Sequence, residues 1–178
     1  KNRGGFNNDW LLSQTLCRDH GVEVEYQTVV EHFCRIFFGE NNDGLICREQ
    51  WIPADGLLER LAARFRLAIF TGRNQAEAGI TLRKYAVGIR FDPLLTADEV
   101  RIGKPAPDGL NMIREQTGAS EFFYVGDTVD DARSARAAGV PFIGIAAQSN
   151  PRYAELVDAM RAENAIAGRL RRTANALL

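Results

Sequence analysis

Short apolar runs alternate with helical patterns along the chain from residue 51 onward. The runs are too short for helices and predict buried strands at residues 67–70, 94–95, 122–125 and 141–145. A helix is expected before the first strand, with its apolar face formed by Leu57, Leu58, Leu61, Ala62 and Phe65. Strands that alternate with helices favour an α/β fold, in which a parallel sheet is covered by helices on both faces.

The first fifty residues show helical patterns only. One helix is predicted to end near His20 and Gly21, and a second is amphipathic. The apolar face of the second helix is formed by Val29, Val30, Phe33, Ile36 and Phe37. Residues 41–46 are then a polar turn. We therefore expect a small helical unit at residues 1–50 and an α/β core at residues 51–178.

Composition narrows the class of protein. The chain has 178 residues, 46% of them apolar, and a net charge of −1. This charge gives no reason to expect binding to nucleic acid or to an anionic membrane. No apolar run approaches the roughly 20 residues of a membrane span. The three cysteines lack metal-type spacing and indicate reduced thiols, so a cytoplasmic location is expected.

Three acidic residues follow the predicted strand at 122–125. Gly126 ends the strand, and Asp127, Asp130 and Asp131 follow within five residues. Open α/β sheets place their ligands at the carboxyl ends of strands, and oxygen donors of this kind suit Mg²⁺. Alternatively, the same acids cap the N-terminus of the next helix, where negative charge is favoured.

Two upstream segments add further polar groups. Thr71 and Gly72 follow the strand at 67–70, where a hydroxyl group and free N–H groups can hold a phosphate oxygen; the pair can equally make a turn and a helix cap. Lys104 lies in a Gly-Lys-Pro-x-Pro segment that holds the backbone extended before a helix begins near Pro107. The alternative for Lys104 is a solvated surface lysine.

In this order, the segments resemble the motifs of the haloacid dehalogenase superfamily of phosphohydrolases, over about residues 67–146. The second motif of that family matches Thr71-Gly72-Arg73, the third matches the segment around Lys104, and the fourth matches Gly126-Asp127 with Asp131. The resemblance implies a Rossmann-like core with a small helical cap. It also implies Mg²⁺-dependent phosphoryl transfer through an aspartyl-phosphate intermediate.

The resemblance further implies roles for individual residues. Thr71 would donate to a phosphate oxygen, and Lys104 would balance the charge of the phosphate and the nucleophile. Asp131 would hold Lys104 or a metal-bound water, and Asp127 would coordinate Mg²⁺. Asp130 is expected to cap the following helix.

The N-terminal segment resembles a loop of the first cap type in this family, which reaches the substrate in relatives similar to phosphoglycolate phosphatase. We expect a small phosphorylated metabolite as substrate. The expected substrate-binding residues are Gly72, Arg73, Lys1, Arg3 and Gly5.

The first motif of the family, Asp-x-Asp-Gly with the nucleophile, has no counterpart in this sequence. The nearest match, residues 41–46, has Asn41 in place of the nucleophile and lies in the predicted turn. We expect the first strand and the nucleophile to precede Lys1, the chain alone to be inactive, and the sheet to have an exposed edge or a gap. The alternative is a non-catalytic binding or regulatory domain. A receiver-type or nucleotide-binding module lacks support, because no Gly-x-Gly-x-x-Gly or Walker-type motif is present.

Overall fold

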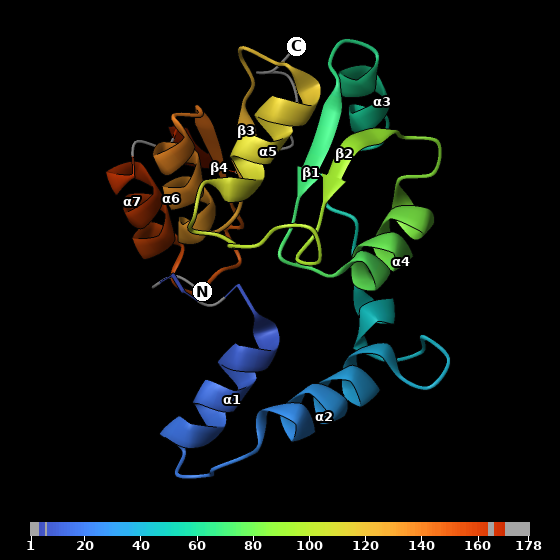
Figure 1. Cartoon of the computed structure of the whole chain (residues 1–178), viewed down its shortest axis with the longest axis vertical. Helices are drawn as coiled ribbons and strands as arrows, with labels where there is room; N and C mark the ends of the chain where they lie inside the picture. Colours follow the sequence, from blue (N-terminus) through green and yellow to red (C-terminus); the bar gives the residue numbers. More distant parts are fainter. Residues whose placement is uncertain (1–3, 6, 164–165, 170–178) are drawn as a thin grey trace. The chain divides into compact units, whose positions relative to one another are not determined.

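The computed structural model describes residues 4–5, 7–163 and 166–169, which fall into two compact units (Figure 1). The smaller unit spans residues 8–52, and the larger contains the described residues before Asn8 and after Ile52. In the described part of the chain, no helix has both the length and the apolar character needed to cross a membrane.

The smaller unit is helical. It consists of α1 (Asp9–Asp19), α2 (Tyr26–Phe38) and the short 3-10 helix η1 (Leu45–Arg48), with α2 packed against both of the others. Val29 and Ile46 are its buried apolar residues. The two predicted helices are therefore confirmed.

Residues 41–44 form a turn, as predicted, but residues 45 and 46 of the predicted turn begin η1. Helix α2 ends at Gly39, whose φ of 71° favours glycine, and the Gly44 N–H donates to the Phe38 carbonyl at 2.9 Å. The chain then enters η1. The segment follows a helix and not a strand, so its resemblance to a nucleophile motif has no counterpart in the fold.

The larger unit alternates helices with strands. Its elements are α3 (Leu57–Ala62), β1 (Leu67–Phe70), α4 (Gln75–Tyr85), β2 (Phe91–Leu95), α5 (Asp108–Thr117), β3 (Tyr124–Gly126), α6 (Val129–Ala138), β4 (Phe142–Ala146), α7 (Tyr153–Ala162) and β5 (Ile166–Arg169). All strand pairs are parallel. The α/β class and the parallel pairing are as expected from the sequence.

The described strands form two sheets. One contains β1 and β2, and the other has the order β3-β4-β5. Hence β1 and β3 each have a hydrogen-bonded strand neighbour on one side only, within the described residues. The sequence-based expectation of an exposed edge or a gap agrees with this division.

Helix α5 links the two sheets. It packs on β1 and β2 and also contacts α6, which covers β3 and β4 (Figure 1). Leu110 and Ile113 of α5 join Phe70 and Phe142 in one hydrophobic cluster. A side chain at Gly109 would collide with the ring of Phe70, so glycine permits this close packing.

Strand β5 was not expected, because the tail from residue 152 has a helical pattern. One helix, α7, is present, but residues 166–169 pair with β4 in register, Ile166 opposite Ile143 and Arg169 opposite Ala146. Pairing with an existing strand outweighs the weak local preference of an Ala- and Gly-containing segment. Strand β2 is also longer than residues 94–95, since Pro93 lies within it.

Candidate functional site

Polar groups gather where β1 and β3 end. Thr71 directly follows β1; its N–H donates to the Leu95 carbonyl at 2.9 Å, and its hydroxyl oxygen accepts from the Arg73 N–H at 3.2 Å. Asp127 directly follows β3 and is exposed. The sequence pattern that placed both residues at strand ends is thus realised in the fold.

A buried ion pair joins Lys104 to Asp131. The Lys104 Nζ lies 2.8 Å from Asp131 Oδ1, and the two side chains are only 10% and 2% exposed. The ammonium group also donates to the Tyr124 hydroxyl oxygen at 3.3 Å and lies 5.1 Å from the centre of the Phe70 ring. Lys104 is therefore not a solvated surface lysine.

Asp131 uses its two carboxylate oxygens for different partners. Oδ1 accepts from Lys104 and, at 2.7 Å, from the Tyr124 hydroxyl group. Oδ2 accepts from the N–H and the hydroxyl group of Thr128 at 2.9 and 2.6 Å, which completes a capping box at the start of α6. The Asp131 side chain therefore both caps the helix and contacts Lys104.

The surroundings of Asp131 and Tyr124 determine their protonation states. Burial raises the pKa of Asp131, but the Lys104 charge and the hydrogen bonds from Lys104, Thr128 and Tyr124 outweigh it, so the pKa is lowered. Burial raises the pKa of Tyr124 well above its ordinary value, and the Asp131 and Asp127 carboxylates raise it further. At neutral pH, Asp131 is a carboxylate and Tyr124 is a hydroxyl donor.

Phe70 connects this group to the turn after β1. Its carbonyl oxygen lies 3.4 Å from the Tyr124 hydroxyl group, and the two ring centres are 6.2 Å apart. Because Thr71 is the next residue, Lys104, Asp131 and Tyr124 lie beside the Thr71 turn. The structure thus brings together three of the predicted site residues from separate segments.

Asp130 binds the N-terminal segment and does not cap α6, in contrast to the sequence-based expectation. The N-cap is Thr128. Asp130 Oδ2 accepts from the Gly5 N–H at 2.6 Å and from Asn7 Nδ2 at 2.8 Å, and the Asn7 amide also donates to the Lys104 carbonyl at 3.2 Å. The described residues between 4 and 7 therefore lie against the core next to Lys104.

Glycine is required where this segment passes Asp130. Gly4 and Gly5 have φ values of 78° and 79°, in the left-handed region. A side chain at Gly4 would also collide with the Asp130 carboxylate and the Arg133 guanidinium group. The Gly-Gly pair thus allows the backbone to approach a buried acid.

Gly72 and Arg73, two further predicted substrate-binding residues, contact different parts of the larger unit. Gly72 lies in the turn after β1, and a Cβ at this position would be 3.2 Å from the Asn7 carbonyl oxygen. The Arg73 guanidinium group donates to the Thr81 hydroxyl oxygen of α4 at 2.9 Å. Lys1 and Arg3 lie outside the described residues.

The described residues do not by themselves fit a Mg²⁺ site. They contain no group of three or more His, Cys, Asp or Glu side chains that could hold a metal ion. Asp130 and Asp131 are buried and engaged in the contacts above, and Asp127 is exposed. A single carboxylate would hold Mg²⁺ only together with water, phosphate oxygens or further acids.

Tyr124 is a site residue that the sequence interpretation missed, whereas Asn7 was expected only as a possible contact of the substrate. The capping-box spacing of Thr128 and Asp131 was a readable signal for the helix start. Tyr124 stood out as the one hydroxyl group in an apolar strand, since a buried tyrosine usually finds a partner for its hydroxyl group. Nothing in the local sequence indicated that Asn7 contacts a segment nearly a hundred residues away.

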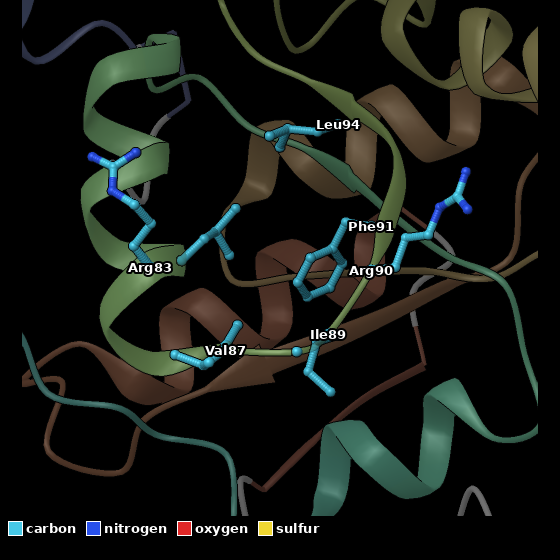
Figure 2. A pocket seen from close by; sticks show the side chains of 9 residues that line it. Arg83, Val87, Ile89, Arg90, Phe91 and Leu94 are labelled. Atoms are coloured by element: carbon cyan, nitrogen blue, oxygen red, sulfur yellow. The ribbon is translucent and has the colours of Figure 1, made fainter.

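A separate pocket lies between the end of α4 and β2, and no predicted site residue lines it. Its volume is about 520 Å³. Figure 2 shows Arg83 and Arg90 on opposite sides of a mainly apolar lining. The lining residues are Leu82, Arg83, Ala86, Val87, Gly88, Ile89, Arg90, Phe91 and Leu94.

Comparison with known proteins places these features in a family. A family model of haloacid dehalogenase-like hydrolases matches residues 4–139. The pyrophosphatase PpaX of Bacillus velezensis is 27% identical over 128 residues, which cover 71% of this chain and 59% of that protein. The phosphoglycolate phosphatase of Escherichia coli is 29% identical over 107 residues, covering 59% and 42%. The chain therefore spans about half the length of these curated relatives.

Solved structures show the same fold. A hydrolase from Pseudomonas syringae superposes with a TM-score of 0.65 at 20% identity, covering 91% of this chain and 73% of that one. A subfamily IA hydrolase of the same superfamily from Geobacter sulfurreducens gives a TM-score of 0.54 at 23% identity, covering 76% and 79%.

Proposed function

Because the chain belongs to the haloacid dehalogenase-like hydrolases, we propose that it is part of a phosphatase acting on a small phosphorylated metabolite. The names of the two curated relatives, a pyrophosphatase and a phosphoglycolate phosphatase, support this reaction class. The observation that carries the proposal is the buried Lys104–Asp131 pair beside the Thr71 turn. A buried cation at the carboxyl edge of parallel strands is suited to hold a phosphate group.

In this proposal, each residue has one task. The Thr71 hydroxyl group donates to a phosphate oxygen, and the Lys104 ammonium neutralises charge that develops as the phosphate is transferred. Asp131 keeps Lys104 in place, as its 2.8 Å contact suggests. Gly5 and the N-terminal segment contact the remainder of the substrate, with Gly72 and Arg73 at the opposite turn.

The nucleophile is an aspartate outside these 178 residues, carried on a strand between β1 and β3. The separation of the two sheets supports this placement, because each of these strands has an open edge in the described structure. The carboxylate attacks phosphorus, the bond to the ester oxygen breaks, and the leaving oxygen takes up a proton. Water then cleaves the aspartyl-phosphate, which releases phosphate and restores the carboxylate.

Binding of Mg²⁺ would need ligands in addition to those in the described residues. Asp127 supplies one hard-oxygen donor, and the acids of the additional strand would have to supply others. When bound, the cation would offset the negative charge of the phosphate.

The test is a phosphatase assay with p-nitrophenyl phosphate and Mg²⁺. The whole gene product should hydrolyse the ester, and the isolated 178-residue chain should not. Asp127→Asn and EDTA should each abolish turnover of the gene product while its circular dichroism spectrum stays unchanged. Turnover by the isolated chain that Asp127→Ala removes would overturn the placement of the nucleophile.

A non-catalytic binding or regulatory domain is the second candidate. It is motivated by the lack of an Asp-x-Asp-Gly segment among these 178 residues. A gene product without Asp-x-Asp-Gly before Lys1, and without turnover, would establish it. The odd number of cysteines motivates a proposed cytoplasmic location for either candidate, which cell fractionation can test.

A further inference from the structure

We propose that Tyr124 is a positioning residue for Lys104, holding the ammonium group together with Asp131 at the place where phosphate binds. The inference rests on the proposed phosphatase function and adds a residue to that site. The three polar groups form a closed triangle. Lys104 Nζ donates to Asp131 Oδ1 at 2.8 Å and to the Tyr124 oxygen at 3.3 Å, and the Tyr124 hydroxyl group donates to the same Oδ1 at 2.7 Å.

The Tyr124 hydroxyl group is itself held rigidly by its ring. The ring centre lies 5.7 Å from that of Phe142 and 6.2 Å from that of Phe70, so aromatic neighbours from both sheets fix it. The hydroxyl group also lies 3.4 Å from the Phe70 carbonyl, but the shorter contact to a charged acceptor takes its single proton. Its oxygen is then free to accept from Lys104.

This arrangement leaves Lys104 one donor for a ligand. An ammonium group has three N–H donors, and the contacts to Asp131 and Tyr124 use two of them. With two fixed acceptors and the Phe70 ring 5.1 Å away, the third donor has a defined direction. If the Tyr124 hydroxyl group is removed, Asp131 remains as the one anchor of this triangle, and the ammonium can rotate.

A structural role for Tyr124 is the competing explanation, because its ring packs in the core. Tyr124→Phe separates the two, since it keeps the ring and removes the oxygen. Tyr153→Phe is the matched control: Tyr153 also packs against the core, but from α7. In the whole gene product, Tyr124→Phe should lower kcat about tenfold and change KM by less than about threefold, since the lost contact orients a charge in the transition state. Tyr153→Phe should change neither.

Dependence on Lys104 is tested by a double mutant. In a Lys104→Ala background, Tyr124→Phe should have no further effect on kcat, because the group that it positions is gone. Equal losses in both backgrounds, or a kcat unchanged by Tyr124→Phe in an active gene product, would overturn the proposal. If the gene product shows no turnover at all, the phosphatase function is refuted instead. The NMR measurement below then tests whether Tyr124 positions Lys104.

The second readout needs no activity. Selective ¹³C-lysine labelling of the whole gene product gives an NMR spectrum in which the Lys104 signals are identified by their loss in Lys104→Ala. The two Hε protons of Lys104 should have separate shifts in the wild-type chain, because the side chain is held near the Phe70 ring. Tyr124→Phe should bring these shifts together, and Tyr153→Phe should leave them apart. Lys104 signals that are identical in all three proteins would refute the positioning role.

Discussion

Lys104 shows how one residue depends on its partners. Its side chain is 10% exposed, and the positive charge is compensated by a carboxylate, a hydroxyl oxygen and an aromatic ring. A buried charge without such partners is costly, so the site has to be assembled as a group. The Lys104–Asp131 pair is therefore both a candidate catalytic feature and part of the folded core.

Lys104→Ala should lower the turnover of the whole gene product by a factor of about 10²–10³, the usual cost of losing a preorganised charge partner. Lys104→Arg should restore only part of it, because a forked guanidinium group does not replace a compact ammonium group in a tight site. The matched control is Lys84→Ala, since Lys84 is exposed on α4. Equal kcat values for the two alanine variants would contradict the assignment.

The lowered pKa of Asp131 predicts a loss of stability in acid. Its pKa is lower in the folded than in the unfolded chain, so its contribution is present above the unfolded value of about 3.9 and is lost as the pH falls through the folded value. Between neutral pH and pH about 3, the free energy of unfolding measured in urea should therefore decline less for Asp131→Asn than for the wild type.

Asp55→Asn is the control for this measurement, because Asp55 is exposed. The free energy of unfolding of Asp55→Asn should decline with falling pH as much as that of the wild type. Parallel curves for all three proteins would show that the Asp131 carboxylate does not stabilise the fold in the way that its contacts indicate.

At the scale of elements, the start of α6 organises the site. Thr128 and Asp131 close the capping box, and Asp130 on the first turn binds the segment around Gly5 and Asn7. Three residues within four positions, Thr128, Asp130 and Asp131, thus connect the helix start to the N-terminal segment and to Lys104. Acids in the first turn also interact favourably with the helix dipole.

Asp130→Asn should weaken the hold on the N-terminal segment. The Gly5 N–H would lose a charged acceptor, and its amide hydrogen exchange should become about tenfold faster, because hydrogen bonds to charged groups are worth more than neutral ones. Asp158→Asn on α7 is the control, since Asp158 is exposed. Unchanged exchange at Gly5 in Asp130→Asn would argue against the anchor.

At the scale of the larger unit, one hydrophobic cluster joins two separate sheets. Helix α5 supplies Leu110 and Ile113 to a core that contains Phe70 from the first sheet and Phe142 from the second. Because β1 and β3 are not paired as neighbouring strands, the sheets are held together by packing across α5 and by the contact between Phe70 and Tyr124. We therefore expect this unit to unfold in one cooperative transition.

Leu110→Ala should reduce the free energy of unfolding by about 2–5 kcal/mol, the usual cost of such a cavity at a fully buried leucine. Ile102→Ala is the control, because Ile102 is 53% exposed and its truncation should cost less than about 0.5 kcal/mol. Urea denaturation measures both. If Leu110→Ala unfolds in two separate transitions, the two sheets no longer unfold together. Leu110 would then couple the sheets more strongly than the rest of the core does.

Local patterns in the sequence determined the class of fold and the residue types at the strand ends. The apolar runs predicted β1, β3 and β4 to within about two residues. However, β3 is not the buried strand that was expected, since Val125 is 45% exposed. Thr71, Lys104 and Asp131 were selected because their segments resemble the motifs of a known family. The turn at 41–44 was also readable, since a polar segment with glycine directly after an amphipathic helix ends that helix.

Only the tertiary structure decided which of these residues meet. Local sequence carries no information on contacts between distant segments, and therefore did not reveal the Asp130 contacts with Gly5 and Asn7 or the Tyr124 triangle. Strand β5 likewise depends on β4 as a partner and not on its own residues. The separation into two sheets has the same origin: β-strand pairing is set by the neighbours that are present, whereas helix starts and turns are set by the residues next to them in the chain.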